Sequence, residues 1–504
     1  MNRILQFQNA PLTDMVAVGA VTSHSARIWL RSHKHGSIVL DWKSEDSPKI
    51  QGRKNAVVSK ENQTDNTLTI DITGLEARTL YNFYVLRENN ELLGQGRFET
   101  APDSEIDTPE RFSFAIMSCN QPFDRQGRVY KEAGQMLRAI RQIMRERETK
   151  YALLLGDQMY SDFPEPLSLF DDDYFATVAP QERGNILECT SEEVRRLFQI
   201  RYRHFWNQEE WMRMVAETPC YPILDDHDIV DNWGSRVEHQ TGKWENLGVG
   251  ARWAYFDYQG SRMRGQGIPG SFHYGFVYGN TATFVMDLRS ERKAGDNGRL
   301  YSHEQQQDLE LFLANHSGKA AFFLVLSVPI IHLPRFLARL VASLPRSGED
   351  FSDRWSSGSH IKDRDRLFRI LHDHQARYPE QRMMLLSGDI HIGCVHCIQW
   401  EDGTPRLYQV ISSPITHYTS RPLQWASKTI IRLNRKVSTR NRDLHARVRP
   451  LQGLEKGMRN PFGKLNFGLI ELETLSGREK PFLRVMFYGH EKGEPVLRYD
   501  SGKL

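Results

Sequence analysis

The sequence predicts an α/β protein that carries a β-sandwich at its N-terminal end. From residue 13 to about residue 101, short β-rich runs are separated by turn residues, with no helical period between them. From about residue 110 onward, short apolar runs alternate with stretches whose apolar residues recur at helical spacing, the pattern of strand–helix–strand units. We therefore expect two domains, 1–103 and 110–504, joined by a small, acidic, proline-flanked linker.

The first domain is expected to be a structural β-sandwich. Its strands are predicted in the runs MVAVGAV, SARIWLRS, SIVLDW, TLTIDI, YNFYVLRE and GQGRFET. The phrase ITGLEARTLYNFYVLREN resembles the late strands of fibronectin type III and immunoglobulin-like domains, where a turn leads into a tyrosine-rich strand. Such a module more often packs against its neighbour than binds a ligand, so we expect packing to be its role.

The second domain is predicted to alternate strands and helices. Helices are expected at 129–148, within 191–214, at 305–315 and at 363–377, and a stretch containing Gly and Trp, without a predicted helix, runs to about residue 270. Strands are expected at FSFAIM, YALLL, CYPIL, SFHYGFVYG, TATFVM, AFFLVLSVPI, MMLLS, LYQVISSP, FGLIELE and FLRVMFYG. Residues 331–360 read as an insertion, which we expect to form a lid packed on the domain.

Composition narrows the class of protein. The 504 residues are 39% hydrophobic and 26% charged, and a net charge of +3 says little about partners. Five cysteines without a framework spacing argue against a disulfide scaffold and fit a reducing compartment. The chain has no apolar run of about 18 residues and no visible leader at its start, so we expect a cytoplasmic protein without a transmembrane segment.

The stretch YALLLGDQMYSD, residues 151–162, is the centre of the candidate site. Its apolar run suits a strand buried on both faces, and Gly156 then breaks the run. Asp157 would lie at the carboxyl end of that strand, where open α/β sheets bind their ligands. Tyr160 follows three residues later, so both side chains can offer oxygen ligands to one metal. An ordinary Gly-Asp turn after a strand is the alternative.

Comparable clusters follow four other apolar runs, which favours a composite site over a chance turn. They are Ser118-Cys119-Asn120 after FSFAIM, Asp225-Asp226-His227-Asp228 after CYPIL, Asp287 with Arg289 after TATFVM, and Gly388-Asp389-Ile390-His391 after MMLLS. Each supplies side chains that can bind a metal or a phosphate.

The order of these motifs resembles the alkaline phosphatase D (PhoD-type) family of calcineurin-like metallophosphatases. SCN, GDQMYSD, DDHD, MDLRS, DRWSSG and SGDIH occur in that order, and the resemblance extends from about Val16 to Tyr499. It implies a calcineurin-like α+β sandwich, with sheets flanked by helices, behind an immunoglobulin-like domain.

The resemblance also implies ligands for two metal ions. Asp157 would bridge them; Cys119, Tyr160 and His391 would complete an Fe³⁺ site, and Asp226 and Asp389, with Asn120 or a backbone carbonyl, a Ca²⁺ site. Other divalent ions such as Mn²⁺ or Zn²⁺ remain alternatives.

The remaining site residues are expected to act on the substrate or to support the ligands. His227 would touch the phosphate or protonate the leaving oxygen, and Arg289 would pair with phosphate oxygens, which Asn120 would also approach. Asp225 and Asp228 would lie behind the ligands, and one of them would orient the imidazole. Asp287 would support the site in the same way, although a surface contact between Asp287 and Arg289 is the alternative.

We therefore predict a metal-dependent phosphoesterase that hydrolyses phosphate mono- or diesters by attack of a metal-bound hydroxide. The sequence has no GxSxG motif and no P-loop that would indicate another mechanism. Two alternatives remain. One is a phosphodiesterase recruited to acidic lipid or nucleic acid through the basic residues of 335–346 and of 421–459, which holds eleven Lys or Arg against two acids. The other is a catalytically inactive protein that binds a phosphate ligand.

Overall fold

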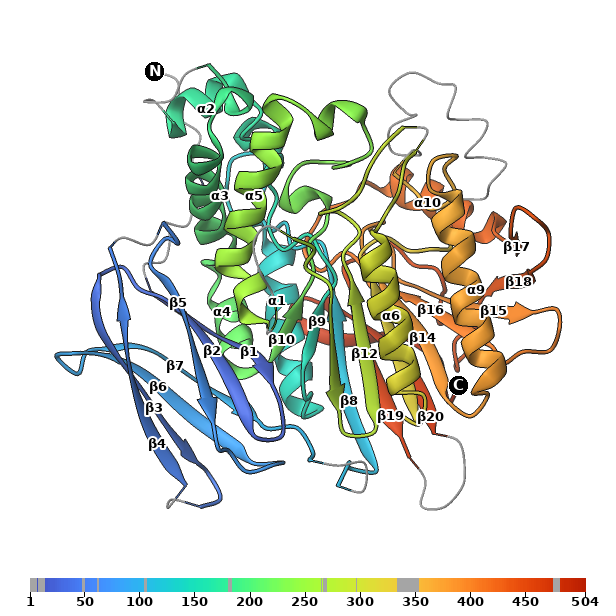
Figure 1. Cartoon of the computed structure of the whole chain (residues 1–504), viewed down its shortest axis with the longest axis horizontal. Helices are drawn as coiled ribbons and strands as arrows, with labels where there is room; N and C mark the ends of the chain where they lie inside the picture. Colours follow the sequence, from blue (N-terminus) through green and yellow to red (C-terminus); the bar gives the residue numbers. More distant parts are fainter. Residues whose placement is uncertain are drawn as a thin grey trace.

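The computed structural model describes residues 7, 14–47, 50–60, 63–103, 107–179, 184–263, 265, 270–295, 297–332, 353–474 and 481–504. Within these ranges the chain forms four β-sheets, with helices around them (Figure 1). Most of the expected insertion at 331–360, including Arg335, Arg339 and Arg346, lies outside the described residues.

Residues 15–99 form two antiparallel sheets that share one core. Their orders are β1-β2-β5 and β4-β3-β6-β7. The strands are β1 (Met15–Val21), β2 (Ser25–Arg31), β3 (Gly36–Ser44), β4 (Gln51–Val58), β5 (Thr67–Thr73), β6 (Leu80–Arg87) and β7 (Leu92–Glu99). Every second residue of β6 is buried, with Tyr81, Phe83 and Val85 in the core between the sheets. Strict alternation thus gives one face to the core, as in a β-sandwich.

The rest of the chain contains a six-stranded and an eight-stranded sheet. The first has the order β10-β9-β8-β19-β20-β21 and the second β11-β12-β13-β14-β16-β15-β18-β17. The strands of the first are β8 (Arg111–Met117), β9 (Ala152–Leu154), β10 (Cys220–Pro222), β19 (Phe467–Glu473), β20 (Phe482–Glu491) and β21 (Glu494–Asp500). Those of the second are β11 (Tyr274–Tyr278), β12 (Thr281–Met286), β13 (Ala321–Leu326), β14 (Arg382–Ser387), β15 (Cys394–Trp400), β16 (Leu407–Ile411), β17 (Lys436–Ser438) and β18 (His445–Pro450). The sheets pack against each other, with the rings of Phe114 and Phe323 4.9 Å apart.

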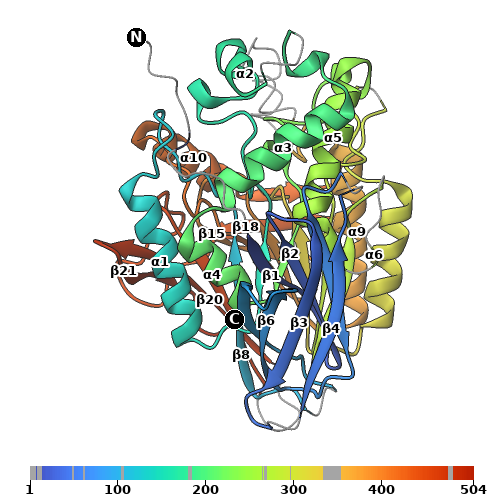
Figure 2. The same ribbon diagram turned by 90° about the vertical axis from the view of Figure 1, so that its left-hand side faces the viewer.

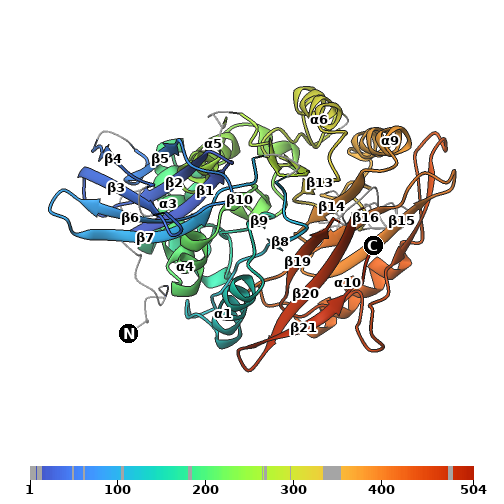
Figure 3. The same ribbon diagram turned by 90° about the horizontal axis from the view of Figure 1, so that it is seen from below.

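Helices cover the outer faces of these two sheets. Figure 3 shows α6 and α9 outside the eight-stranded sheet and α1 beside the six-stranded one. The helices are α1 (Lys131–Glu146), α2 (Asp172–Val178), α3 (Ser191–Trp206), α4 (Glu209–Glu217), α5 (Lys243–Tyr258), α6 (His303–Asn315), α9 (Ile361–Arg377) and α10 (Arg421–Leu433). In α1 the buried residues Met136, Ile140 and Ile143 recur at spacings of three and four, which gives one apolar face to the sheet.

The parallel part of each sheet positions the site. β8, β9 and β10 are parallel to one another, as are β12, β13, β14 and β16. The carboxyl ends of parallel strands share one edge of a sheet. The loops after β8, β9, β10, β12 and β14 carry the clusters predicted from the sequence, so the two sheets deliver them to neighbouring edges.

Three helices lie in segments where the sequence predicted none, namely α2, α5 and α10. A Cβ at Gly250 would lie 2.4 Å from the Ser191 carbonyl oxygen at the start of α3, and one at Gly248 would lie 2.5 Å from the Trp233 ring. Gly248 and Gly250 therefore mark where α5 packs closest to its neighbours.

Arginine and carboxylate side chains join the N-terminal sandwich to the rest of the chain. Asp65, before β5, pairs with Arg31 of its own sheet and with Arg203 of α3, and it accepts a hydrogen bond from Tyr258 of α5. Trp29 donates to the Asp257 carbonyl at 2.7 Å. Figure 2 shows the sandwich (blue) lying alongside α4. No helix in the described ranges has the length and apolarity needed to cross a membrane.

Candidate active site

Asp157 follows β9 directly, in the loop predicted to be the centre of the site. Its backbone N–H donates to Asp228 Oδ2 at 3.0 Å, which ties the β9 loop to the β10 loop. Gly156 has φ of 98°, and a Cβ there would lie 2.4 Å from Asp225 Cβ. Glycine is therefore required both for the backbone conformation and for the close approach of the two loops.

Two other expected ligands converge on the Asp157 carboxylate. Cys119 Sγ and Tyr160 Oη each lie 3.3 Å from Asp157 Oδ2. Ser413 donates to Cys119 Sγ at 3.0 Å, which fixes the thiol from the opposite side. Burial raises the pKa of Cys119 and of Tyr160 well above their usual ranges, and the Asp157 charge adds to both effects. Without a cation nearby, both groups keep their protons.

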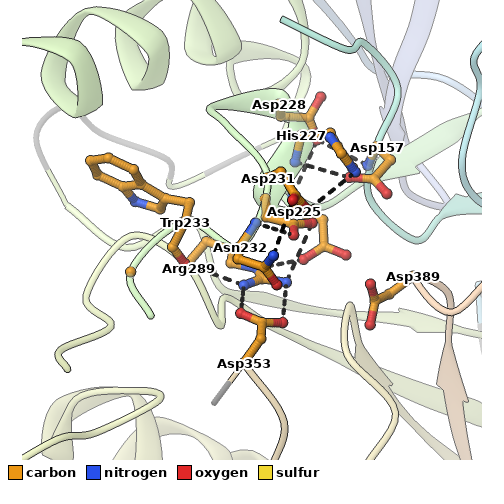
Figure 4. Close-up of polar contacts among 12 residues, drawn as sticks. Asp157, Asp225, His227, Asp228, Asp231, Asn232, Trp233, Arg289, Asp353 and Asp389 are labelled. Atoms are coloured by element: carbon orange, nitrogen blue, oxygen red, sulfur yellow. Dashed lines mark hydrogen bonds and ion pairs between the residues drawn. The ribbon is translucent and has the colours of Figure 1, made fainter. Parts of the chain in front are cut away.

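Carboxylates crowd the other side of Asp157. Possible ligand atoms of Asp157, Asp226 and His227 lie within 4.8 Å of one another, and so do those of Asp225, Asp226 and Asp389. Figure 4 shows Asp389 facing this cluster from another loop. Burial, with the charges of Asp225 and Asp226, raises the pKa of Asp157 well above its usual range. Burial likewise raises the pKa of Asp225 to about 6. So many buried acids favour a bound cation.

His227 is oriented by Asp162, the last residue of the YALLLGDQMYSD stretch. Its Nδ1 lies 2.8 and 3.0 Å from the two Asp162 oxygens, and its ring stacks on Tyr160 at 4.3 Å. We expected Asp225 or Asp228 to do this. Although burial lowers the pKa of His227, the Asp162 charge and hydrogen bond help to raise it well above its usual range. Asp162 thereby fixes which ring nitrogen faces the site.

Asp228 braces the two loops from behind. Its Oδ2 accepts the N–H groups of Asp157 and Asp225 at 3.0 and 3.1 Å, and Tyr202 donates to its Oδ1 at 3.3 Å. Burial raises the pKa of Asp228 to about 7. Asp287 stabilises the loop after β12 in the same way, because its Oδ1 accepts hydrogen bonds from the N–H groups of Arg289 and Ser290, both at 2.9 Å.

Arg289 is fully buried within a set of carboxylates, which differs from the phosphate contact expected from the sequence. Its Nε donates to Asp225 Oδ1 at 2.6 Å, and Nη1 donates to Asp353 Oδ1 at 2.6 Å (Figure 4). Its Nη2 lies 3.4 Å from Asp226 Oδ1. Arg292 reaches the same Asp353 oxygen at 2.9 Å. In this arrangement Arg289 holds the carboxylates in place, and its hydrogen-bonding groups face them.

Arg354 is the arginine that meets the site at its edge. It forms an ion pair with Asp389 Oδ2, and its side chain is 15% exposed. The same Nη1 lies 3.8 Å from Asp353 Oδ2. Arg354 thus places a cationic group beside a predicted metal ligand, with access to solvent that Arg289 lacks.

His391 and Asn120 are buried near the same centre with unpaired atoms. His391 Nε2 has no hydrogen-bond partner in the described part of the chain, and burial lowers its pKa to about 3. Its ring stacks on His417 at 4.0 Å, and His417 lies 5.4 Å from the Tyr160 ring. Asn120 Oδ1 accepts from Thr416 at 2.9 Å, whereas its Nδ2 has no partner among the described residues.

Comparison with known proteins places this chain in a family. The PhoD-like phosphatase family model matches residues 114–452, more than half of the chain. The chain belongs to the PhoD-like phosphatase family. This confirms the resemblance inferred from the motifs.

Solved structures support the mixed α/β fold of this PhoD-like phosphatase. A structure of PhoD matches with a TM-score of 0.65 and 14% identity, over 96% of this chain and 91% of the other. Purple acid phosphatase PPD1 from yellow lupin (Lupinus luteus) seeds matches with a TM-score of 0.54 and 10% identity, over 98% of this chain and 74% of the other.

A sequence relative matches part of the chain. The uncharacterized protein YGR266W of Saccharomyces cerevisiae is 24% identical over 328 residues, 50% of this chain and 46% of its own length. The chain thus spans about half the length of that relative.

Sequence reasoning did not assign four residues that this PhoD-like phosphatase brings to the site: Asp162, Asp353, Arg354 and His417. The first lies in the central stretch, and the next two lie in the DRWSSG motif. His417 follows β16, and its backbone N–H donates to the Cys119 carbonyl at 3.2 Å. Position after a strand was the available signal for His417, since the loop after LYQVISSP ends at the same edge of the sheet.

Proposed function

We propose that this PhoD-like phosphatase hydrolyses phosphate mono- or diesters at a centre that holds two metal ions. The observation that carries the proposal is the position of the Asp157 carboxylate. Its Oδ2 meets Cys119 and Tyr160, whereas its Oδ1 lies on the side of His227 and the acidic cluster. A carboxylate between a thiol–phenol pair and a group of acids is placed to serve two different ions.

The residues present fit metal ions. Buried polar atoms without a hydrogen-bond partner in the described residues include Asp225 Oδ2, Asn120 Nδ2, His391 Nε2 and His417 Nδ1. Buried polar groups are normally paired, so a concentration of unpaired ones around one centre indicates an absent partner. If the Asn120 amide is rotated by 180°, its Oδ1 takes the place of the unpaired Nδ2. Its Nδ2 then donates a hydrogen bond to the Thr416 hydroxyl, which becomes the acceptor.

The ligands divide into two sets of different chemistry. Cys119, Tyr160 and His391, with Asp157, would hold the iron, for which thiolate and tyrosinate are strong donors. Asp226, Asp389 and Asn120, again with Asp157, would hold Ca²⁺ or another ion that prefers oxygen. When bound, such a pair of ions activates water and neutralises charge on the phosphoryl group.

The residues around the ligands would handle the proton and the phosphate. His227, held by Asp162, would donate a proton from Nε2 to the leaving oxygen. We assign the phosphate contact to Arg354 rather than Arg289, because Arg354 is partly exposed, whereas Arg289 is buried among acids. Arg289 would position Asp225 and Asp226.

Three expectations remain predictions. The split of seven strands into sheets of three and four supports an immunoglobulin or fibronectin type III type for the first 103 residues, which we propose to be structural. The domain boundary near 103–110 and the cytoplasmic location are not tested by the fold. A catalytically inactive ligand-binding protein is disfavoured, because binding a phosphate would not require a complete set of metal ligands.

The deciding experiment measures hydrolysis of bis-(p-nitrophenyl) phosphate together with the metal content of the protein. We expect chelator-sensitive turnover and bound metal in the wild type, and loss of both in Asp157→Asn. Asp373→Asn, an exposed carboxylate on α9, is the matched control and should behave as the wild type. A visible absorption band that disappears in Tyr160→Phe would support iron at the first set. Metal-free, fully active protein would overturn the proposal.

A further inference from the structure

Helix α10, in the upper right of Figure 1, and its flanks expose large apolar side chains. Tyr418 and Trp425 are each 70% exposed, Leu423 is 55% exposed and Leu433 is 48% exposed. Single exposed apolar residues are ordinary on protein surfaces. Four of them within sixteen residues are not, and Ile431 is the residue of α10 that the fold buries fully. We name these four residues and the cations beside them the α10 surface.

Five basic residues complete the α10 surface: Arg421, Lys428, Arg432, Arg459 and Lys464. In the described part of the chain none of the five forms an ion pair with an acid. Arg421, Trp425, Lys428 and Arg432 follow one another at spacings of four, three and four, so they lie along one stripe of the helix. Burial, followed by the charges of Arg432, Arg459 and Lys464, lowers the pKa of Lys428. The cations are thus close enough to repel one another.

A short loop connects the α10 surface to the site. Between β16 and α10, the N–H groups of Thr416 and His417 donate to the Cys119 carbonyl, at 3.3 and 3.2 Å. His417 also lines a groove of about 250 Å³ that includes Tyr418, Gln424 and Lys464. A ligand that rests on α10 would therefore lie next to a groove lined by His417, and the His417 ring stacks on the ring of His391.

We propose that the α10 surface docks on an anionic phospholipid bilayer and brings headgroup phosphates to the groove beside His417. The docking itself is independent of catalysis; only the delivery of an ester to the site rests on the proposed function. The surface combines the two features that such binding requires, apolar side chains that enter the interface and cations that meet anionic headgroups. Trp425 and Tyr418 suit the boundary, because each has an apolar ring and a polar group.

A bilayer explains this surface better than a nucleic acid. Phosphates of a nucleic acid would satisfy the cations, and the bases would stack on aromatic rings placed in series. Neither would use Leu423 and Leu433. The interfacial zone of an anionic membrane can accept both kinds of group at once, because leucine and tryptophan enter its apolar part and the cations meet its headgroups.

The test is sedimentation of the full chain with vesicles of phosphatidylcholine, with and without phosphatidylserine. We expect binding only with phosphatidylserine, weakened by salt. Lys428→Ala with Arg432→Ala should weaken binding about fivefold per residue. Leu423→Ser with Trp425→Ser should reduce it further at high salt, where the charges are screened.

Matched controls lie on the other side of the molecule (Figure 2). Leu311→Ser on α6, where the side chain is 61% exposed, and Arg377→Ala on α9 should bind vesicles as the wild type does. The α10 variants should keep the wild-type melting temperature and hydrolyse bis-(p-nitrophenyl) phosphate at the wild-type rate, which separates docking from chemistry.

Three outcomes would overturn the proposal: equal binding to neutral vesicles, binding unaffected by all four α10 substitutions, or binding of a duplex oligonucleotide in place of vesicles. If the wild type binds anionic vesicles but hydrolyses no soluble ester, docking stands and the proposed function fails. If it hydrolyses the soluble ester but ignores vesicles, the docking proposal fails alone.

Discussion

Replacing Asp162 by Asn tests whether the orientation of His227 matters to catalysis. The substitution keeps the size of the side chain and an acceptor for the Asp231 N–H, which lies 2.7 Å from Asp162 Oδ2. It removes the negative charge that meets His227 Nδ1 at 2.8 and 3.0 Å. The side chains are only 17% and 12% exposed, so solvent cannot replace that contact well.

A hydrogen bond to a charged group contributes about 1.5–3 kcal/mol. If that contact acts mainly in the transition state, kcat should fall about 10- to 100-fold with little change in KM, because about 1.4 kcal/mol corresponds to tenfold in rate. A proton donor matters most when the leaving oxygen is basic. The loss should therefore be larger for an alkyl phosphate ester than for a p-nitrophenyl ester.

The assay is steady-state hydrolysis of both esters by the variants and the wild type at equal metal content. Asp231→Asn is the matched control, because Asp231 is 58% exposed and its carboxylate lies 3.7 Å from His227 Nε2; a change below about twofold is expected. In a His227→Gln background, Asp162→Asn should not lower kcat any further. A full additional loss in that background, or an equal loss for both esters, would refute the assigned role.

Two predictions concern stability. Arg289→Met should lower the free energy of unfolding by about 3–5 kcal/mol in chemical denaturation, because it leaves Asp225 buried without its cation and leaves Asp353 with Arg292 and the more distant Arg354. Asp65→Asn should lower the melting temperature at pH 7, and it should do so less at pH 3. Burial raises the pKa of Asp65, yet the arginines that hydrogen-bond to it hold that pKa below its usual range, so its stabilising charge is present above pH of about 4 and is lost as pH falls through the folded value.

Exposed counterparts provide the controls. Arg53→Met breaks an exposed pair with Asp41 and should lower the free energy of unfolding far less than Arg289→Met does. Asp46→Asn removes an exposed carboxylate of the same sandwich and should leave the melting temperature unchanged at both pH values. The reasoning about Arg289 is wrong if its variant is as stable as Arg53→Met. The reasoning about Asp65 is wrong if its effect persists undiminished at pH 3.

Much of the site could be anticipated because its residues follow apolar strands. Position after a strand is a local property of the sequence, and parallel strands convert it into proximity. Asp157, Asp226 and Asp389 therefore lie together although more than two hundred residues separate the first from the last.

The partners of these residues were harder to foresee. That Asp162 contacts His227, or that Arg289 turns toward Asp353, depends on how separate loops cross. No periodicity reports such a crossing. Helix α5 was missed for a related reason, since Gly248 and Gly250 lower helix propensity but permit close packing.

The backbone of the site has a cost that concerns protein engineering. Cys119, Asp157, Asp389 and His391 all have positive φ, between 52° and 66°. This conformation is unfavourable for residues with a Cβ, less so for aspartate and histidine than for cysteine. Glycine at any of the four positions would relieve the backbone and remove a ligand. Directed evolution that selects for heat resistance alone would therefore favour variants that are more stable but have lost a ligand and with it their activity.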